Sequence, residues 1–407
     1  MLHEFWQNFT DNLFKPLLLF FYFGFLIPIL KVRFEFPYVI YQGLTMYLLV
    51  AIGWQGGEEL AKIAPADIDN IAGFVAVGFV LNFVIGALTY FLLRYLTAMR
   101  RVDRATVAGY YGSDSAGTFA TCVAVLTSVG IAFNAYMPVM LALMEIPGCV
   151  VALYLVARLR RRGMDEAGFM PDEPGYAAPV KVGPGAAVQP VGTETLNAEA
   201  ERGIEEELEF SLEKREHPGW YERTPGTKAP LFSREILQEV FLNPGLILLV
   251  GGIIIGFISA LQGQKVVHED DHLFVAAFQG VLCLFLLEMG MTASRKLRDL
   301  KSAGRGFIVF GLVAPNIFAA LGILVAYTYS YLTDAHFQPG TYVLFAVLCA
   351  GASYITVPAV QRLGIPEASP TLPLAAALGL TFSYNVTIGI PLYIEFVRTV
   401  GHWFPGT

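Results

Sequence analysis

The sequence predicts an all-α membrane protein: ten transmembrane helices in two five-helix repeats of inverted topology, with breaks in the fourth and ninth spans. Its composition, its spaced apolar runs and a match between its halves lead to this fold class. Hydrophobic residues make up 55% of the 407 residues and charged residues 15%, whereas a soluble domain carries about 25% charged residues. Lipid must therefore cover much of the surface, which excludes a cytosolic enzyme, a nucleic-acid-binding protein and a secreted domain.

Ten apolar runs have the length for a transmembrane helix, which needs about 20 mostly apolar residues. They cover approximately 14–30, 36–54, 70–97, 105–127, 134–157, 243–261, 272–293, 304–331, 341–362 and 372–398. Lysine and arginine gather after the odd-numbered spans, as in the arginine-rich run 158–162, and acids such as Glu269, Asp270 and Asp271 dominate the other loops. By the positive-inside rule, the odd-numbered loops are cytoplasmic and both termini lie outside.

One long polar stretch separates the halves and gives three regions: repeat 1 (1–158), a cytoplasmic, largely flexible linker (159–235) and repeat 2 (236–407). The linker is rich in proline and glycine, which is typical of a flexible segment. Within it, the glutamate-rich run 194–216 carries Ile204, Leu208 and Leu212 at helical spacing. This run is either a solvated run of charges or a short amphipathic helix that docks a cytoplasmic regulator.

The two halves share a pattern. At one constant offset, residues of the second span match residues of the seventh: Gln42, Gly43, Leu49, Gly53 and Leu60 match Gln279, Gly280, Leu286, Gly290 and Leu297. The step Glu145-Ile146-Pro147 likewise resembles Gly389-Ile390-Pro391. Five spans per half invert the second half, and inverted repeats are typical of secondary transporters with a midplane site between interrupted helices. The alternative is a duplicated membrane protein that does not transport.

The fourth and ninth spans contain the predicted breaks, over 109–118 and 351–358. Both runs are rich in glycine and small hydroxyl residues, and Pro358 disfavours helix before it. Two half-helices that meet by their N-termini present backbone N–H groups and positive dipole ends, which suit a small oxyanion. We therefore expect a substrate site formed by Gly112, Ser113, Asp114, Ser115, Thr118, Ser353, Tyr354 and Thr356. The alternative is that the small residues only permit close helix packing.

Acids within the membrane require a role because their burial is costly. Asp114 and Glu145 are candidates for binding a coupling cation or a proton. Sodium prefers oxygen ligands, and the tenth span supplies neutral oxygens around a predicted kink at Gly389-Ile390-Pro391. The predicted sodium ligands are Glu145, Thr381, Ser383, Asn385 and Thr387.

At these residues the chain resembles the sodium-dependent bicarbonate transporters first described in cyanobacteria and their broader bacterial relatives. The resemblance rests on the glycine–serine break of the fourth span, Glu145-Ile146-Pro147, Ser353-Tyr354-Ile355, the run 362–370 and Ile388-Gly389-Ile390-Pro391-Leu392. It implies ten spans, inverted halves, external termini, a homotrimer, and bicarbonate bound between the breaks with sodium nearby. In cyanobacterial members, a PII-like trimeric protein closes the transporter from the cytoplasm.

The chain departs from the cyanobacterial pattern at both breaks. Tyr354 stands where that pattern has an aspartate, and Asp114 stands where it has an apolar residue. Either the acid has moved to the facing half, or the substrate or the coupling ion has changed.

We therefore predict a sodium-coupled symporter that imports bicarbonate or a similar small anion by alternating access across the bacterial inner membrane. It is not an enzyme and uses no cofactor apart from the coupling ion. The alternatives are a symporter for a small organic carboxylate and a non-transporting sensor that signals through 159–235. A serine hydrolase at Ser353 lacks a general base, because all six histidines lie in termini, loops or span ends.

Overall fold

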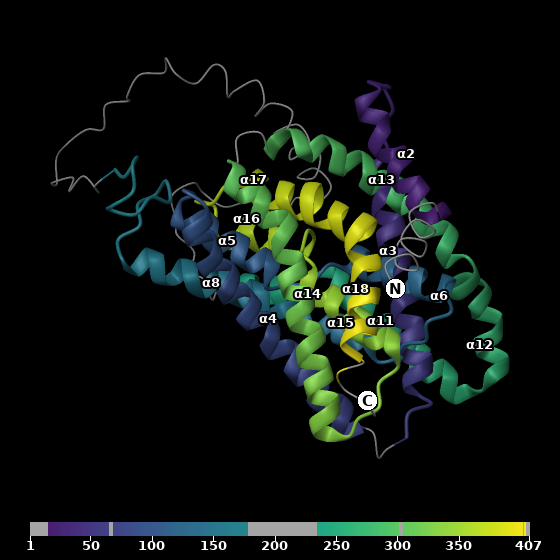
Figure 1. Cartoon of the computed structure of the whole chain (residues 1–407). Coiled ribbons are helices and arrows are strands. Elements are labelled where there is room, and N and C mark those ends of the chain that lie inside the picture. Colours follow the sequence, from purple (N-terminus) through teal and green to yellow (C-terminus); the bar gives the residue numbers. More distant parts are fainter. Residues whose placement is uncertain (1–14, 65–67, 178–233, 301–303, 402, 404–407) are drawn as a thin grey trace. The chain divides into compact units, whose positions relative to one another are not determined.

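The computed structural model describes residues 15–64, 68–177, 234–300, 304–401 and 403, and these residues form helices and connecting segments without a strand (Figure 1). The proposed amphipathic run 194–216 lies outside the described residues. The helices, in chain order, are α2 (Pro16–Ile29), α3 (Tyr38–Leu60), α4 (Ile68–Leu96), α5 (Arg101–Tyr111), α6 (Ala116–Ser128), α7 (Met137–Met144), α8 (Ile146–Arg161), α10 (Arg234–Phe241), α11 (Pro244–Gln262), α12 (Gln264–Asp271), η2 (His272–Ala276), α13 (Phe278–Asp299), α14 (Arg305–Thr333), α15 (Pro339–Ala350), α16 (Thr356–Gly364), α17 (Thr371–Ala375), η4 (Ala376–Phe382), η5 (Asn385–Gly389) and α18 (Ile390–Gly401).

The all-α prediction is confirmed, and each of the ten apolar runs contains helix. Six helical stretches of the described chain are long and apolar enough to cross a membrane: Ile68–Leu96, Met137–Arg161, Pro244–Gln262, Val266–Arg298, Arg305–Thr333 and Thr371–Gly401. Two shorter apolar helices are α2 and α15. The fourth and ninth runs give no single helix of spanning length, because each is divided between two helices.

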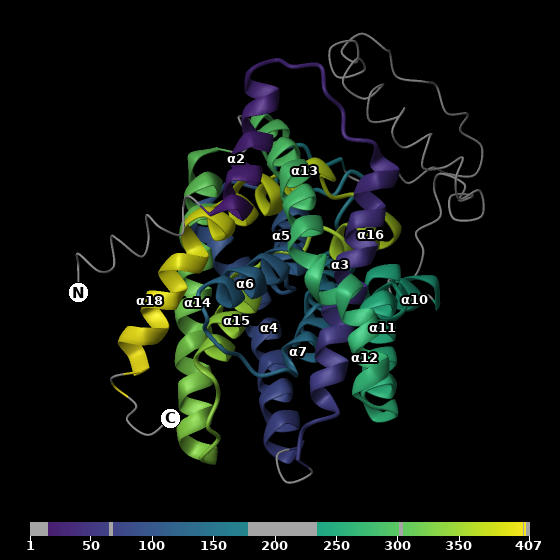
Figure 2. The same cartoon turned by 90° about the vertical axis from the view of Figure 1, so that its right-hand side faces the viewer.

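Two helix pairs approach so closely that only glycine fits between their backbones. In the pair α3–α11, a Cβ on Gly53 would lie 2.4 Å from the carbonyl oxygen of Leu249. In the pair α2–α13, a Cβ on Gly290 would lie 2.2 Å from the carbonyl oxygen of Phe21. Figure 2 shows α11 beside α3 and α13 beside α2. Small residues at such contacts are typical of helix packing in membranes.

The broken helices are buried, and the outer helices carry exposed apolar side chains. In α15, all residues from Gly340 to Ala350 are buried. By contrast, Phe23 of α2 is 58% exposed and Ile254 of α11 is 53% exposed. Apolar side chains on the outside and a closely packed centre are expected when lipid surrounds the helices.

The end of α8 and the residues that follow it are packed against other parts of the helical bundle. Arg160 donates two hydrogen bonds to the carboxylate of Glu367, at 2.9 and 2.7 Å. The carboxylate of Glu173 accepts from the backbone N–H of Arg101 at 2.8 Å and from that of Met170 at 2.8 Å. The first part of the predicted linker thus contacts the beginning of α5, while Arg160 ties α8 to the segment after α16.

Candidate functional site

The first break covers residues 112–115, between α5 and α6. Ser115 has an extended backbone (φ −134°, ψ 105°) and is the N-cap of α6, since its hydroxyl accepts from the backbone N–H of Thr118 at 3.3 Å. Gly112 packs against α4, where a Cβ on it would lie 3.0 Å from Cα of Gly86. The close approach requires glycine at 112, and the serine cap restarts the helix at Ala116.

The second break covers residues 351–355, between α15 and α16. Gly351 is extended (φ −70°, ψ 168°), and a Cβ on it would lie 2.9 Å from the backbone nitrogen of Ser115. The backbone N–H of Ser353 donates to the carbonyl oxygen of Tyr110 at 2.8 Å. The two breaks, more than 200 residues apart in the sequence, are therefore in direct contact.

The breaks are shorter than the sequence predicts. Of the run 109–118, only 112–115 leaves the helix, and of 351–358, only 351–355 does. Gly109 stays helical because it fills a tight contact, where a Cβ would lie 2.7 Å from Cβ of Ala152. Close packing here overrides the weak helix propensity of glycine.

The expectation of free backbone N–H groups at the helix N-termini is wrong for three of them. The N–H of Gly117 donates to the hydroxyl of Tyr354 at 3.1 Å, that of Thr118 to Ser115, and that of Val357 to Ser353 at 3.3 Å. Hydroxyl groups occupy the positions that the sequence assigns to an anion. Buried N–H groups need partners, and nearby hydroxyl side chains supply them here.

Asp114 lies inside the first break and is 1% exposed. Neither of its carboxylate oxygens has a hydrogen-bond partner. The neighbouring hydroxyls are engaged elsewhere, because Ser113 donates to the carbonyl oxygen of Glu145 at 2.9 Å and Ser115 pairs with Thr118 at 2.7 Å. The Glu145 carboxylate accepts a hydrogen bond from Thr356, at the first turn of α16. Side chains from both halves thus meet around the breaks.

The four predicted sodium ligands of the tenth span form hydrogen bonds within the protein. Thr381 pairs with the hydroxyl of Tyr111 at 2.6 Å, and Asn385 donates to the carbonyl oxygen of Ala350 at 2.9 Å. Ser383 and Thr387 bond carbonyl oxygens of the same span, at 3.1 and 2.7 Å. The span contains the π-helical turns η4 and η5, not a simple kink. Through Tyr111 and Ala350, it holds the ends of α5 and α15 at the breaks.

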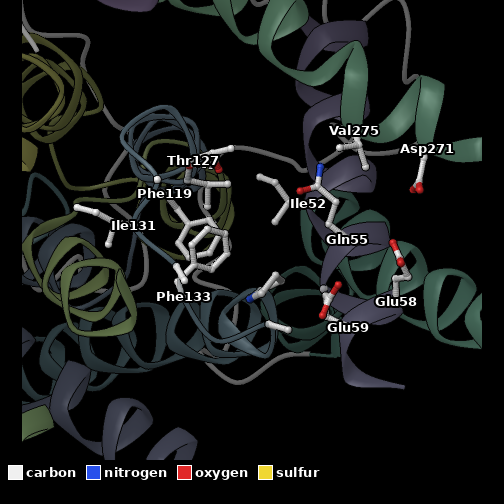
Figure 3. A pocket seen from close by; sticks show the side chains of 16 residues that line it. Ile52, Gln55, Glu58, Glu59, Phe119, Thr127, Ile131, Phe133, Asp271 and Val275 are labelled. Carbon is white, nitrogen blue, oxygen red and sulfur yellow. Dashed lines mark hydrogen bonds between the residues drawn. The ribbon is translucent and has the colours of Figure 1, made fainter. Parts of the chain in front are cut away.

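A cavity of about 550 Å³, here called the vestibule, lies between α3, α6, the segment before α7 and η2. Figure 3 shows Glu58, Glu59 and Asp271 on its acidic side and Phe119 and Phe133 on its apolar side. A second cavity, of about 10 Å³, touches Gly117 and Tyr354 at the breaks, and Ile52 lines both cavities. The smaller one has room for about one water molecule. Ile52 is therefore a shared wall between the vestibule and the breaks.

The sequence does not reveal the vestibule, because its walls come from four separate segments. Glu58 and Glu59 at the end of the second span, with Asp271 before the seventh, are the acidic residues in the sequence that could have indicated it.

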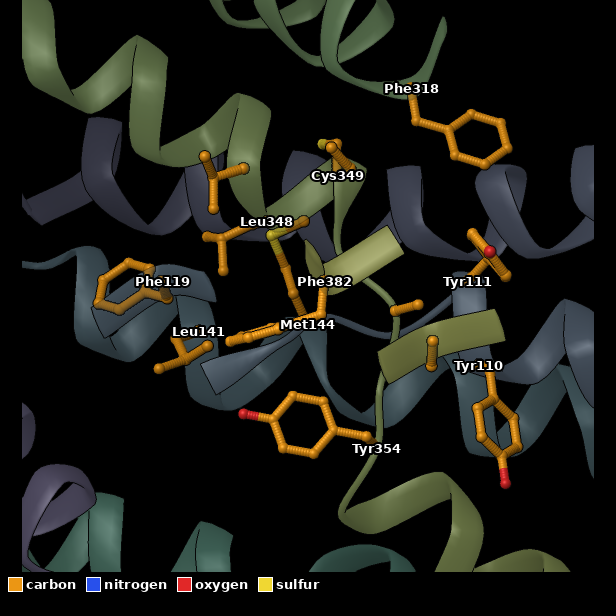
Figure 4. Packing of buried hydrophobic residues seen from close by; sticks show 14 of the residues in the cluster. Tyr110, Tyr111, Phe119, Leu141, Met144, Phe318, Leu348, Cys349, Tyr354 and Phe382 are labelled. Carbon is orange, nitrogen blue, oxygen red and sulfur yellow. The ribbon is translucent and has the colours of Figure 1, made fainter. Parts of the chain in front are cut away.

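Buried aromatic side chains, among them Tyr110, Tyr111, Tyr354 and Phe382, pack around the breaks (Figure 4). No group of three or more His, Cys, Asp or Glu side chains suited to a metal occurs in the described chain. A cation here would thus need amide, hydroxyl or backbone oxygens besides a carboxylate.

The apolar helices, with paired breaks in their buried centre, indicate an integral membrane protein. The model of the Na⁺-dependent bicarbonate transporter superfamily matches residues 16–398, nearly the whole chain, and the chain belongs to this family. The resemblance seen in the sequence is thereby confirmed, and family membership makes the chain a transporter and not an enzyme. A comparison with curated proteins found no match.

Proposed function

We propose that the protein is a sodium-coupled symporter that imports bicarbonate by alternating access, with the anion bound between the two breaks. The observation that carries this proposal is the direct contact of the breaks beside the vestibule. Irregular backbone at membrane depth is tolerated only where it is buried in protein or lines a water-filled cavity. Residues 112–115 are buried, and Tyr354 and Ile355 of the second break line the smaller cavity.

The proposal includes ten spans in two inverted repeats, with both termini outside the inner membrane. Two equivalent helix pairs support it. Gly53 of α3 packs on the backbone of α11, and Gly290 of α13, its match in the repeat, packs on the backbone of α2. A pseudo-twofold axis in the membrane plane relates such pairs in inverted repeats. In this orientation the vestibule opens toward the outside, which supports an outward-facing state.

Bicarbonate, on this proposal, displaces the hydroxyl of Tyr354 from the N–H of Gly117 and takes that N–H as a donor. The hydroxyls of Ser115 and Thr118 lie beside the same helix N-terminus and add further donors. Neither 109–118 nor 351–358 contains lysine or arginine. Neutral donors and the dipole of α6 bind an anion without a full counter-charge, which permits its release on the other side.

Sodium supplies the driving force. One sodium ion with one bicarbonate is electroneutral, so the membrane potential, which contributes about 2.3 kcal/mol per net charge at 100 mV, does no work on the pair. Uptake at this stoichiometry depends on the sodium gradient alone.

We also propose a homotrimer, and a PII-like regulator that contacts the cytoplasmic linker. The resemblance to the cyanobacterial transporters implies both, although the linker does not visibly match theirs, and the packing of 162–176 against α5 gives the linker a direct route to the first break.

Uptake of ¹⁴C-bicarbonate into proteoliposomes tests the function. An inward sodium gradient should drive uptake, and an equal potassium gradient should not. Thr118→Val should reduce uptake at least about tenfold, since a lost hydrogen bond to a charged group costs about 1.5–3 kcal/mol. Thr399→Val, which removes an exposed hydroxyl of α18, is the matched control and should transport normally.

Excess acetate or pyruvate serves as a competitor in the same assay. Sodium-driven uptake of either compound in preference to bicarbonate would assign the site to an organic carboxylate. Absence of uptake of all three anions would contradict the symporter proposal and favour a sensor.

A further inference from the structure

Two buried side chains near the first break have oxygen atoms without partners. Asp114 is 1% exposed and lacks a partner for both carboxylate oxygens, and Asn82 of α4 is 0% exposed and lacks one for Oδ1. Buried oxygens of this kind are rare in folded proteins, because each loses its hydration without compensation. All three atoms are acceptors, so what they lack is a donor or a cation.

The two side chains lie where α4, the first break and the α7–α8 joint meet. Asn82 donates through Nδ2 to the carbonyl oxygen of Met144 at 2.7 Å. Ser113, the residue before Asp114, donates to the next carbonyl oxygen, that of Glu145. A Cβ on Gly112 would lie 3.1 Å from the backbone oxygen of Asn82, so α4 packs directly on the break. Asn82 and Ser113, the residue before Asp114, therefore donate to the carbonyl oxygens of two consecutive residues at the α7–α8 joint.

No positive side chain compensates Asp114. In the part of the chain that the structure describes, no lysine, arginine or histidine forms an ion pair with it. The titratable groups that face it are Glu145 from the α7–α8 joint, Cys149 from α8 and Cys349 from α15, and none of these supplies a positive charge. An uncompensated carboxylate at such depth is costly, whereas a bound cation removes the cost.

We propose that Asp114 and Asn82 form a binding site for one sodium ion, with the carboxylate as the charged ligand and Oδ1 of Asn82 as a neutral one. Hard oxygen ligands of both kinds suit sodium. The four oxygen-bearing side chains predicted in the tenth span are engaged in hydrogen bonds, whereas these oxygens are not. The bound ion neutralises Asp114, so that an anion can approach Ser115 beside it. The identity of the ion rests on the proposed function.

Binding of ²²Na⁺ to the purified full-length protein in nanodiscs, without bicarbonate, tests the site. The wild type should bind sodium saturably. Asp114→Asn keeps the shape of the side chain and removes its charge, and should weaken binding by at least about a hundredfold, as when a buried charge loses its partner. Asn82→Ala should weaken it by about tenfold, the effect of one lost neutral ligand.

Asp334→Asn is the matched control, because this side chain is 97% exposed and asparagine accepts its left-handed backbone. It should bind sodium like the wild type. Thermal unfolding without sodium separates a ligand from a structural residue. As a sodium ligand, Asp114 is uncompensated without the ion, so Asp114→Asn should melt no lower than the wild type and lose the stabilisation by sodium.

Unchanged sodium binding in Asp114→Asn would overturn the site, and so would a wild type that binds no sodium with or without bicarbonate. Bicarbonate uptake in proteoliposomes is measured separately. If uptake stays sodium-driven while Asp114→Asn binds sodium normally, the site is wrong and the proposed function stands. If wild-type uptake is independent of sodium, the proposed coupling fails as well.

Discussion

The two breaks are both short non-helical segments between helices, but their chemistry differs. The first holds an uncompensated carboxylate, Asp114, and a serine cap that closes its own helix. The second holds no acid. The hydroxyl of Tyr354 accepts from the N–H of Gly117, and Thr356, the first residue of α16 after this break, donates to the carboxylate of Glu145. The uncompensated carboxylate and the proposed anion donors both lie on the side of the first break, and the hydroxyl of Tyr354 from the second break covers one of those donors, the N–H of Gly117. The comparison suggests that the first break binds the cation while the second controls access to the anion donors.

The largest effect is expected from separating the breaks. Gly351→Val places side-chain atoms where even a Cβ would lie 2.9 Å from the backbone of Ser115. A displacement of about 1 Å at a binding site costs about a hundredfold, so bicarbonate uptake should fall by at least that factor. Gly251→Val is the matched control, since a Cβ there meets nothing within 4 Å. Equal uptake by the two variants would show that contact between the breaks is not needed.

The second-largest effect, on the free energy of unfolding, is expected from the ion pair that connects α8 to the segment after α16. Glu367, after α16, is 5% exposed in its side chain and binds Arg160 of α8 through two hydrogen bonds. Arg160→Ala should lower the free energy of unfolding by about 3 kcal/mol, because it leaves a nearly buried carboxylate without its partner. The combination with Glu367→Gln should cost less than the sum of the single changes in a denaturation series. Additive losses would mean that the pair does not couple α8 to the second break.

Tyr354→Phe tests whether the second break controls access to the anion donors of the first. The change frees the N–H of Gly117, so bicarbonate no longer competes with a hydroxyl there. The KM for bicarbonate should fall by about fivefold, which corresponds to one neutral hydrogen bond of about 1 kcal/mol. Tyr329→Phe, which removes a hydroxyl bonded to the carbonyl oxygen of Asn70 far from the breaks, serves as the control. A rise in KM would instead make the hydroxyl of Tyr354 an anion ligand.

The smallest effect is expected at the vestibule. Lys62, just beyond α3, pairs with Glu59 and Glu58, and these carboxylates raise its pKa above the ordinary value, so it is charged at pH 7. Lys62→Gln makes the vestibule more negative and should raise the apparent sodium affinity of uptake by about twofold at low ionic strength. High salt should remove the gain through screening. A gain that persists at high salt would rule out an electrostatic origin.

Local sequence was enough to find where the helices break, but not how many residues leave the helix at each break. Glycine, serine and proline have poor helix propensity, which located the interruptions in the fourth and ninth spans. The predicted lengths were too long because packing of Gly109 and the cap at Ser115 keep the flanking residues helical. In the tenth span, the expected kink is a π-helical stretch whose polar side chains bond within the protein. Sequence spacing does not reveal which partner a hydroxyl will find.

The sequence by itself determined the membrane class, the family, the apolar runs and the positions of the breaks. These follow from composition, local propensity and motifs, all of which are properties of neighbouring residues. Only the tertiary structure decided that the breaks touch, that Tyr354 caps Gly117, and that the carboxylate of Asp114 and Oδ1 of Asn82 lack partners near one joint. Each of these depends on residues distant in the chain, and the balance between a satisfied and an unsatisfied polar group exists only once those residues are brought together.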